Sequence, residues 1–128
     1  MMVLVDTSVW SLALRDRGGP IVEKLEKNIE RGRVTLLGII VQEVLQGIRR
    51  ERDARAVAKK LEPFPLLQLS REDHAAAADL HRACARRGVT VATIDCHIAS
   101  AAMRHDCWLL TADGDFEQIA RVATLKLI

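Results

Sequence analysis

The sequence has few aromatic residues and no long apolar run. Phenylalanine and tryptophan make up 3% of the 128 residues, and tyrosine is absent. A surface that stacks nucleic-acid bases on aromatic rings is therefore not expected. The longest apolar runs, such as residues 36–41, fall far short of the roughly 18 residues that a membrane-spanning helix needs. We therefore expect no contact with a membrane.

Cysteine is also scarce, and no basic-then-apolar leader opens the chain. Cys84, Cys96 and Cys107 are an odd number without the close spacing of a disulfide scaffold. We therefore expect reduced thiols in a cytoplasmic protein. A zinc site can be assembled from these cysteines and nearby histidines, but no standard finger or ribbon spacing is present. Buried cysteines with surface histidines are the favoured interpretation.

The overall composition is that of a globular protein. Apolar residues make up 49% and charged residues 28%, and 19 basic residues against 17 acidic ones give a formal charge of +2. The length predicts one domain spanning residues 1–128. The small net charge does not by itself indicate a nucleic-acid partner. No G-x-G-x-x-G segment follows the first apolar run, so a nucleotide cofactor is not expected.

Apolar segments alternate with amphipathic ones along the chain. Strands are predicted at residues 2–5, 34–37, 66–69, 108–111 and 123–128, with an extended stretch at 89–94. Helices are predicted at residues 9–14, 21–31, 39–50, 70–87, 95–106 and 114–120. The charged stretch 51–61 either continues the third helix or forms a separate one. Ser70 and Asp73 form a capping box at the start of the clearest helix. This alternation is typical of an α/β fold with a parallel sheet covered by helices on both faces.

Acidic residues follow several of the predicted strands. Asp6 comes directly after the first strand, and Asp113 and Asp115 follow the fourth. Glu43 lies one turn into the helix after the second strand, and Asp95 begins the helix after the extended stretch. Ligands of parallel sheets bind beyond the carboxyl ends of the strands. We therefore expect these five carboxylates at one edge of the sheet.

Two of these acids lie on apolar helix faces, where a carboxylate is costly. Asp95 shares its face with Ile98 and Ala102, and Glu43 borders an apolar face. A partly buried carboxylate costs several kcal/mol without compensation, and neighbouring acids add to this cost. A divalent cation such as Mg²⁺ or Mn²⁺, which prefers oxygen ligands, would offset both costs.

Each acid also has a simpler explanation. Asp6 can cap the helix that follows it, and Asp95 can complement a helix dipole. Asp113 or Asp115 can be an N-cap, with Gln118 completing a capping box with Asp115. Together these explanations account poorly for Glu43 and Asp95, so a metal site is favoured.

Four short motifs occur in order along the chain. They are VLVDTSVW at residues 3–10, QEVLQG at 42–47, TIDCHIA at 93–99 and LLTADGDF at 109–116. In order, spacing and total length they resemble the PIN-domain ribonucleases, and more narrowly the VapC-type toxin of VapBC toxin–antitoxin modules. The resemblance implies a three-layer α/β/α sandwich around a mainly parallel sheet of about five strands. It also implies Mg²⁺- or Mn²⁺-dependent cleavage of RNA, a homodimer, and inhibition by a small antitoxin protein.

The resemblance also assigns roles to individual residues. The catalytic, metal-binding quartet of the family corresponds to Asp6, Glu43, Asp95 and Asp113. Asp115 corresponds to an additional metal ligand, and Ser8 and Thr111 to supporting hydroxyl groups. A bound divalent ion lowers the pKa of water and screens charge on a phosphoryl group, which suits hydrolysis of a phosphodiester.

Basic residues between positions 49 and 60 are the candidates for contact with RNA phosphates. We expect Arg49, Arg50, Arg52 and Arg55 to bind RNA, with the arginines at 82, 86 and 87 as a second set. The alternative is a solvated helix face with pairs three or four residues apart.

Three other functions compete with a toxin nuclease. One is a housekeeping RNA-processing nuclease, and another is a catalytically silent protein-binding module of the same fold. A phosphatase with an aspartyl nucleophile is disfavoured because position 8, two residues after Asp6, is serine. Trp10, Leu12 and Leu14 are core residues or form a groove for an antitoxin helix.

Overall fold

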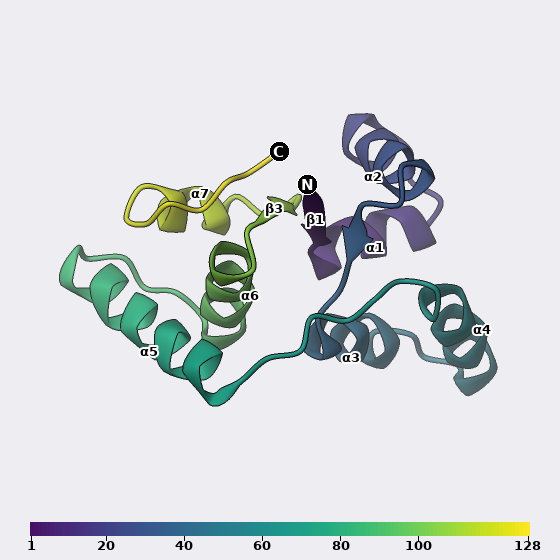
Figure 1. Cartoon of the computed structure of the whole chain (residues 1–128). Coiled ribbons are helices and arrows are strands. Elements are labelled where there is room, and N and C mark those ends of the chain that lie inside the picture. Colours follow the sequence, from purple (N-terminus) through teal and green to yellow (C-terminus); the bar gives the residue numbers. More distant parts are fainter.

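The structure is a computed structural model that describes residues 1–128. It contains three strands and seven helices (Figure 1). In chain order they are β1 (Met2–Val5), α1 (Thr7–Leu14), α2 (Pro20–Glu30), β2 (Val34–Thr35), α3 (Gly38–Gln46), α4 (Glu51–Leu61), α5 (Arg71–Arg86), α6 (Thr93–Arg104), β3 (Cys107–Leu110) and α7 (Asp115–Ala120). None of the helices has both the length and the apolarity that crossing a bilayer requires.

The three strands form a parallel sheet with β1 in the middle. The order is β2-β1-β3, with Val3 paired to Val34 on one side and to Trp108 on the other. Val3, Leu4 and Val5 are fully buried. β1 is covered on both faces of the sheet, and a strand buried on both faces consists of a continuous run of apolar residues.

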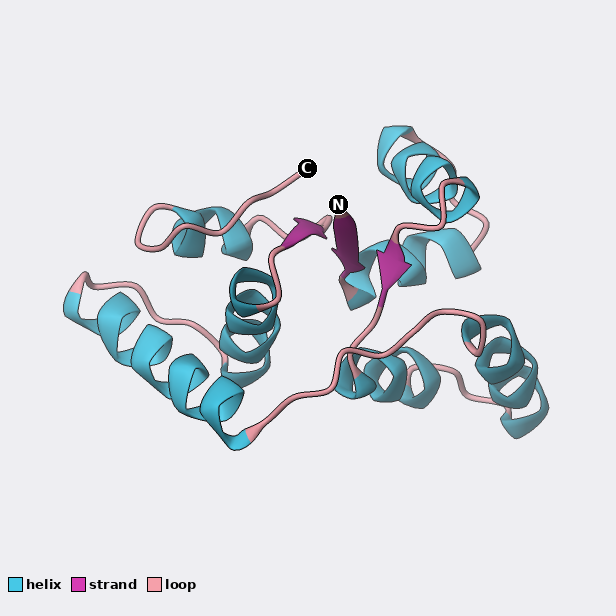
Figure 2. Ribbon diagram, viewed as in Figure 1, coloured by secondary structure: helices cyan, strands magenta, loops and turns pink.

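Helices cover the sheet on both sides. Figure 2 shows α5, α6 and α7 on one side of the strands and α1 to α4 on the other. The three layers enclose one apolar core, to which both helical layers and all three strands contribute. The predicted α/β fold with a parallel sheet and flanking helices is confirmed.

The sheet has fewer strands than predicted, because two segments make only single bridges to it. Residues 66–69 were expected to form a strand, but only Leu66 pairs, with Leu36. Pro65 lies at this junction and has no N–H to donate, so its carbonyl oxygen alone contributes, accepting from the Leu36 N–H at 2.9 Å.

The C-terminal segment 123–128 makes the second single bridge. Leu127 lies opposite Leu109 in parallel orientation, and the Leu109 N–H donates to the Lys126 carbonyl at 2.9 Å. The prediction of about five strands is therefore wrong in number. The five segments nevertheless lie side by side in parallel, because the two bridges extend the sheet at its two edges.

Two helix boundaries follow from local chemistry. The Ser70 hydroxyl accepts from the Asp73 N–H at 3.3 Å, and the Asp73 carboxylate accepts from the Ser70 N–H at 2.8 Å. This confirms the predicted capping box of α5. The stretch 51–61 forms the separate helix α4, because α3 already ends at Gln46.

Candidate functional site

The five predicted acids come from four chain segments. Asp6 follows β1 directly, Glu43 lies on α3, and Asp95 is the third residue of α6. Asp113 lies between β3 and α7, and Asp115 is the first residue of α7. Asp6, Glu43, Asp113 and Asp115 therefore lie at the carboxyl end of a strand or in the element that follows it. Asp95 is the exception, because α6 follows α5 and the expected extended stretch before it forms no strand.

Three of these carboxylates meet closely. Oxygen atoms of Asp95, Asp113 and Asp115 lie within 4.8 Å of one another, which is a spacing that can hold a metal ion. Carboxylate oxygens are the ligands that Mg²⁺ and Mn²⁺ prefer. Asp6 and Glu43 lie outside this close group of three.

The charges of all four other acids act on Asp95. Burial foremost, and then the charges of Asp113, Asp6, Asp115 and Glu43, together raise the pKa of Asp95 to about 6. The five carboxylates therefore form one electrostatic cluster, with half-buried Asp95 within range of every member.

Asp6 is held by two hydroxyl groups. Ser8 Oγ and Thr111 Oγ1 each donate to Asp6 Oδ2 at 2.8 Å, and the side chain of Asp6 is nearly buried. Asp6 occupies the N-cap position of α1, but its side chain caps no backbone N–H. The explanation of Asp6 as a side-chain helix cap is therefore wrong.

The same hydroxyls fix the loop that carries Asp113. Ser8 Oγ accepts from the Ala112 N–H, and Thr111 Oγ1 accepts from the Asp113 N–H, both at 3.0 Å. Asp113 Oδ1 in turn accepts from the Asp115 N–H at 2.9 Å. These bonds join the end of β1 to the start of α7 and orient three of the acids.

The suggested capping box between Asp115 and Gln118 does not form. Gly114 is the N-cap residue of α7 and has no side chain, and the first N–H of the helix is bound by Asp113 Oδ1 instead. The Asp115 side chain therefore makes no capping bond that would explain its position beside two other acids.

Thr7 is a site residue that sequence reasoning missed. Its Oγ1 donates to Glu43 Oε1 at 2.8 Å, joining the first residue of α1 to the middle of α3. The available signal was its place between Asp6 and Ser8 in the first motif. Its partner depends on how α1 packs on α3, which the sequence does not reveal.

No protein cation neutralises the acidic cluster. The structure contains five ion pairs, and their acidic members are Glu51, Asp79, Asp73 and Asp106. None of these is a member of the cluster. Half-buried like charges without a counterion favour a bound cation, so the residues present fit a divalent metal ion.

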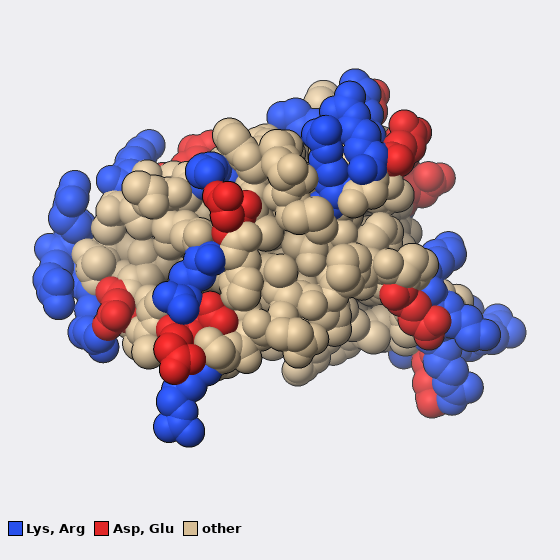
Figure 3. Space-filling model, viewed as in Figure 1, with Lys and Arg blue, Asp and Glu red and all other residues tan.

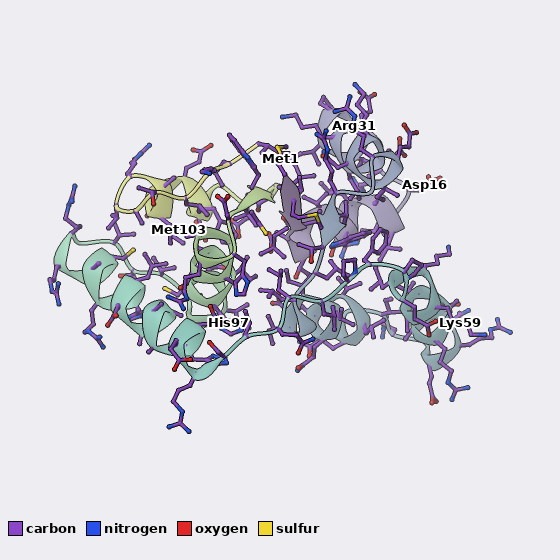
Figure 4. The ribbon with its side chains drawn as sticks, in the orientation of Figure 1. Met1, Asp16, Arg31, Lys59, His97 and Met103 are labelled. Carbon is purple, nitrogen blue, oxygen red and sulfur yellow. The ribbon has the colours of Figure 1, made fainter.

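A cavity adjoins the first turn of α6, which carries Asp95. It has a volume of about 550 Å³ and lies between α5 and α6, with Thr93 and Ile94 in its wall. His97 on α6 stacks on His74 of α5 at 5.0 Å between ring centroids, and it lies between α5 and α3 in Figure 4. Burial and the neighbouring His74 lower the pKa of His97. The cavity wall therefore combines apolar side chains with the histidine pair and with Arg82.

The basic residues predicted to bind RNA lie on or just before α4, which packs against the helix α3 that carries Glu43. Arg49 and Arg50 precede α4, while Arg52 and Arg55 are on it, and all four are exposed. Arg55 forms an ion pair with Glu51. Figure 3 shows Lys and Arg gathered over α4, over α2 and over the C-terminal end of α5, at the periphery of the molecule.

Comparisons with known proteins agree with this arrangement. The PIN domain family model matches residues 3–122. The chain is 32% identical to the VapC ribonuclease Mb1587 of Mycobacterium bovis and to Ribonuclease VapC11 of Mycobacterium tuberculosis. Each of these alignments covers 98% of this chain and 96% of the relative.

Solved structures show the same fold. FitAcB from Neisseria gonorrhoeae matches with a TM-score of 0.80 at 25% identity, over 99% of this chain and 96% of that one. VapBC2 from Rickettsia felis, bound to a DNA fragment from their promoter, matches with a TM-score of 0.84 at 17% identity, over 100% and 98% of the two chains. On the family match and the full-length relatives, the chain belongs to the PIN domain family and, within it, to the VapC-type proteins.

Proposed function

We propose that this protein is a metal-dependent endoribonuclease that acts as the toxin of a type II toxin–antitoxin module. The observation that carries the proposal is the convergence of five carboxylates at the sheet edge without a protein cation. The full-length relatives are named as ribonucleases, which supports RNA as the substrate.

Asp95, Asp113 and Asp115 would hold a Mg²⁺ or Mn²⁺ ion, with Asp6 and Glu43 as the further acidic ligands. Such an ion supplies an activated water and screens negative charge on the phosphodiester. Ser8 and Thr111 hold the Asp6 carboxylate in one orientation. Thr7 holds Glu43, whose free oxygen is available to orient a water molecule or accept its proton.

The test is RNA cleavage with Asp6→Asn and Asp95→Asn variants at saturating Mg²⁺ or Mn²⁺. We expect rates to fall at least 100-fold, because each change removes a carboxylate from the metal-binding cluster. Asp79→Asn, an exposed acid on α5, is the matched control and should cleave normally. Undiminished cleavage by folded Asp6→Asn and Asp95→Asn variants would contradict the assignment.

Binding of the metal is a separate readout. Calorimetric titration of wild type with Mn²⁺ should show saturable binding that Asp95→Asn weakens by 10- to 100-fold. A chain that binds neither ion and cleaves no RNA would instead be a protein-binding module.

A small antitoxin protein is the proposed partner. Solved VapBC complexes share this fold, and α1, α2 and α4 enclose a groove of about 320 Å³. Trp10 and Phe64 pack against each other in its wall with tilted rings whose centroids are 5.3 Å apart, and the exposed side chains of Leu14 and Ile29 border it. An apolar helix face of the antitoxin fits such a groove.

The toxin role and a housekeeping role predict different phenotypes. Expression of a toxin should arrest growth, and co-expression of the small protein encoded beside it should restore growth. A housekeeping nuclease should produce neither effect.

We further propose a homodimer, which light scattering would detect as twice the 14.2 kDa mass of the chain.

A further inference from the structure

A small polar hollow between α5 and α7 contains two arginines without acidic partners. It has a volume of about 240 Å³ and is lined by Arg87, Val89, Gln118, Arg121 and Val122. No carboxylate lines it. Two guanidinium groups and an amide therefore border one concave surface.

Neither arginine is neutralised by the protein. Arg87 and Arg121 are exposed, and neither belongs to any of the five ion pairs or donates a side-chain hydrogen bond. Like charges that share a hollow repel each other, and an anion between them would remove the repulsion. Arginine is also the side chain best suited to grip a phosphate, through its planar set of donors.

The residues that line the hollow belong to chain segments that also carry two of the acids, Asp95 and Asp115. Gln118 and Arg121 follow Asp115 on α7, and six residues of helix span about 9 Å along its axis. Arg87 and Val89 lie on the loop that enters α6, which carries Asp95. A strand of nucleic acid that has a phosphate at the acidic cluster would have to extend along α7 to bring another phosphate to this hollow.

Each arginine also has a simpler role. Arg87 and Arg121 are the C-cap residues of α5 and α7, where a cation complements the helix dipole. That role explains why each residue is basic, but it does not require the two side chains to share a hollow. Figure 3 shows Lys and Arg gathered over the C-terminal end of α5, the helix whose C-cap residue is Arg87.

We propose that Arg87 and Arg121, with Gln118, form a subsite for a backbone phosphate of RNA at the end of α7 remote from Asp115. The subsite would be independent of base identity, because it contacts only the backbone. It rests on the proposed function, since it presumes that RNA reaches the acidic cluster.

The test is binding of a fluorescent single-stranded RNA 12-mer to the full chain in EDTA, so that no cleavage occurs. The Arg87→Gln/Arg121→Gln variant should bind about tenfold more weakly at 100 mM salt, and its dependence of log Kd on log salt should be shallower by about 1. In the presence of Mg²⁺ or Mn²⁺, the same variant should raise KM for RNA and leave kcat unchanged.

Two variants separate this subsite from net charge and from folding. Arg31→Gln/Arg33→Gln removes the same charge before β2, at the opposite edge of the sheet, and should bind RNA within twofold of wild type. Arg87→Lys/Arg121→Lys keeps both charges and should retain the salt dependence. Equal weakening by the two Gln pairs, no weakening at Arg87 and Arg121, or a lost salt dependence in the Lys variant would each overturn the proposal.

Failure of the subsite and failure of the proposed function are distinguishable. If wild type does not cleave RNA with either metal ion, the nuclease assignment fails, whatever the binding results. If wild type cleaves RNA but the Arg87→Gln/Arg121→Gln variant binds it normally, the subsite alone fails.

Discussion

Thr7 donates a 2.8 Å hydrogen bond from its hydroxyl to the carboxylate of Glu43, across 36 residues of sequence. The bond is partly shielded from water, and it fixes one oxygen of an acid that otherwise has no partner in the structure. Partners of this kind, which hold a metal-binding acid in place, typically change metal affinity or activity by 10- to 100-fold.

Thr7→Val should therefore weaken RNA cleavage about tenfold at subsaturating metal, because valine keeps the shape and removes the donor. The measurement is the cleavage rate as a function of Mn²⁺ concentration. Thr35→Val is the matched control, since it removes a buried hydroxyl that donates to the Pro65 carbonyl, away from the acids. Equal metal dependence in the two variants would show that Thr7 does not position Glu43.

Asp95 should make the metal-free protein less stable as pH rises. Its pKa is about 6 in the folded chain against 3.8 without the fold, so between these values the folded chain keeps a proton that the unfolded chain has released. Protonated Asp95 therefore favours the folded chain. This contribution to stability is fully present below about pH 4 and is lost as pH rises through about 6. Thermal unfolding in EDTA measures the effect.

Asp95→Asn removes that titration and serves as the reference for all other groups. Its melting temperature should exceed that of wild type at pH 7.5, and the difference should shrink toward pH 4. Added Mn²⁺ should raise the melting temperature of wild type at pH 7.5 but not that of the variant. A difference between the two proteins that is constant with pH would contradict this prediction.

Asp73 should contribute to stability rather than to catalysis. It is buried and accepts hydrogen bonds from the Ser70 N–H at 2.8 Å and from Arg104 Nε at 2.7 Å, with His105 at 3.2 Å. These contacts, the Ser70 N–H foremost, hold the pKa of Asp73 well below its usual range. Its stabilising effect is therefore present above pH 4 and is lost as pH falls further.

Asp73→Asn should lower the free energy of unfolding at pH 7 by about 2 kcal/mol, the usual scale for hydrogen bonds to a charged group. Urea unfolding measures it. Asp79→Asn, on the same helix but in an exposed pair with Arg82, should change stability by less than about 0.5 kcal/mol. Equal losses in the two variants would contradict the assigned role of Asp73.

The groove between α1, α2 and α4 should be needed for the antitoxin and not for cleavage. Leu14→Glu and Ile29→Glu place a charge on two exposed apolar side chains of the groove, and should abolish co-purification with the antitoxin. Leu66→Glu changes an equally exposed leucine outside the groove and should not affect binding. RNA cleavage should be normal in all three variants.

The parallel sheet, the flanking helices and the placement of Asp6 and Asp113 could be predicted, because each depends on local sequence. Apolar runs form the strands, Asp6 follows β1 directly, and Asp113 lies in the loop after β3. Asp95 was expected at the start of a helix after an extended stretch, but it is the third residue of α6 and no strand precedes that helix directly. The bond from Thr7 to Glu43 could not be predicted, because it depends on how α1 meets α3 in space.

The predicted number of strands was wrong because strand pairing also depends on how the segments pack in space. The apolar pattern of residues 66–69 shows that the segment is extended, but only the packed structure shows how far it pairs. The choice between one helix and two over residues 39–61 was equally undecided in the sequence, and the structure gives two.

The topology also sets when the site can exist during synthesis. β1 is made first, but its neighbour β3 and the acids Asp113 and Asp115 come more than a hundred residues later. A nascent chain therefore carries Asp6 and Glu43 for a long stretch of synthesis before Asp113 and Asp115 are made. The complete cluster can form only after β3 and the start of α7 have been synthesised and β3 has paired with β1.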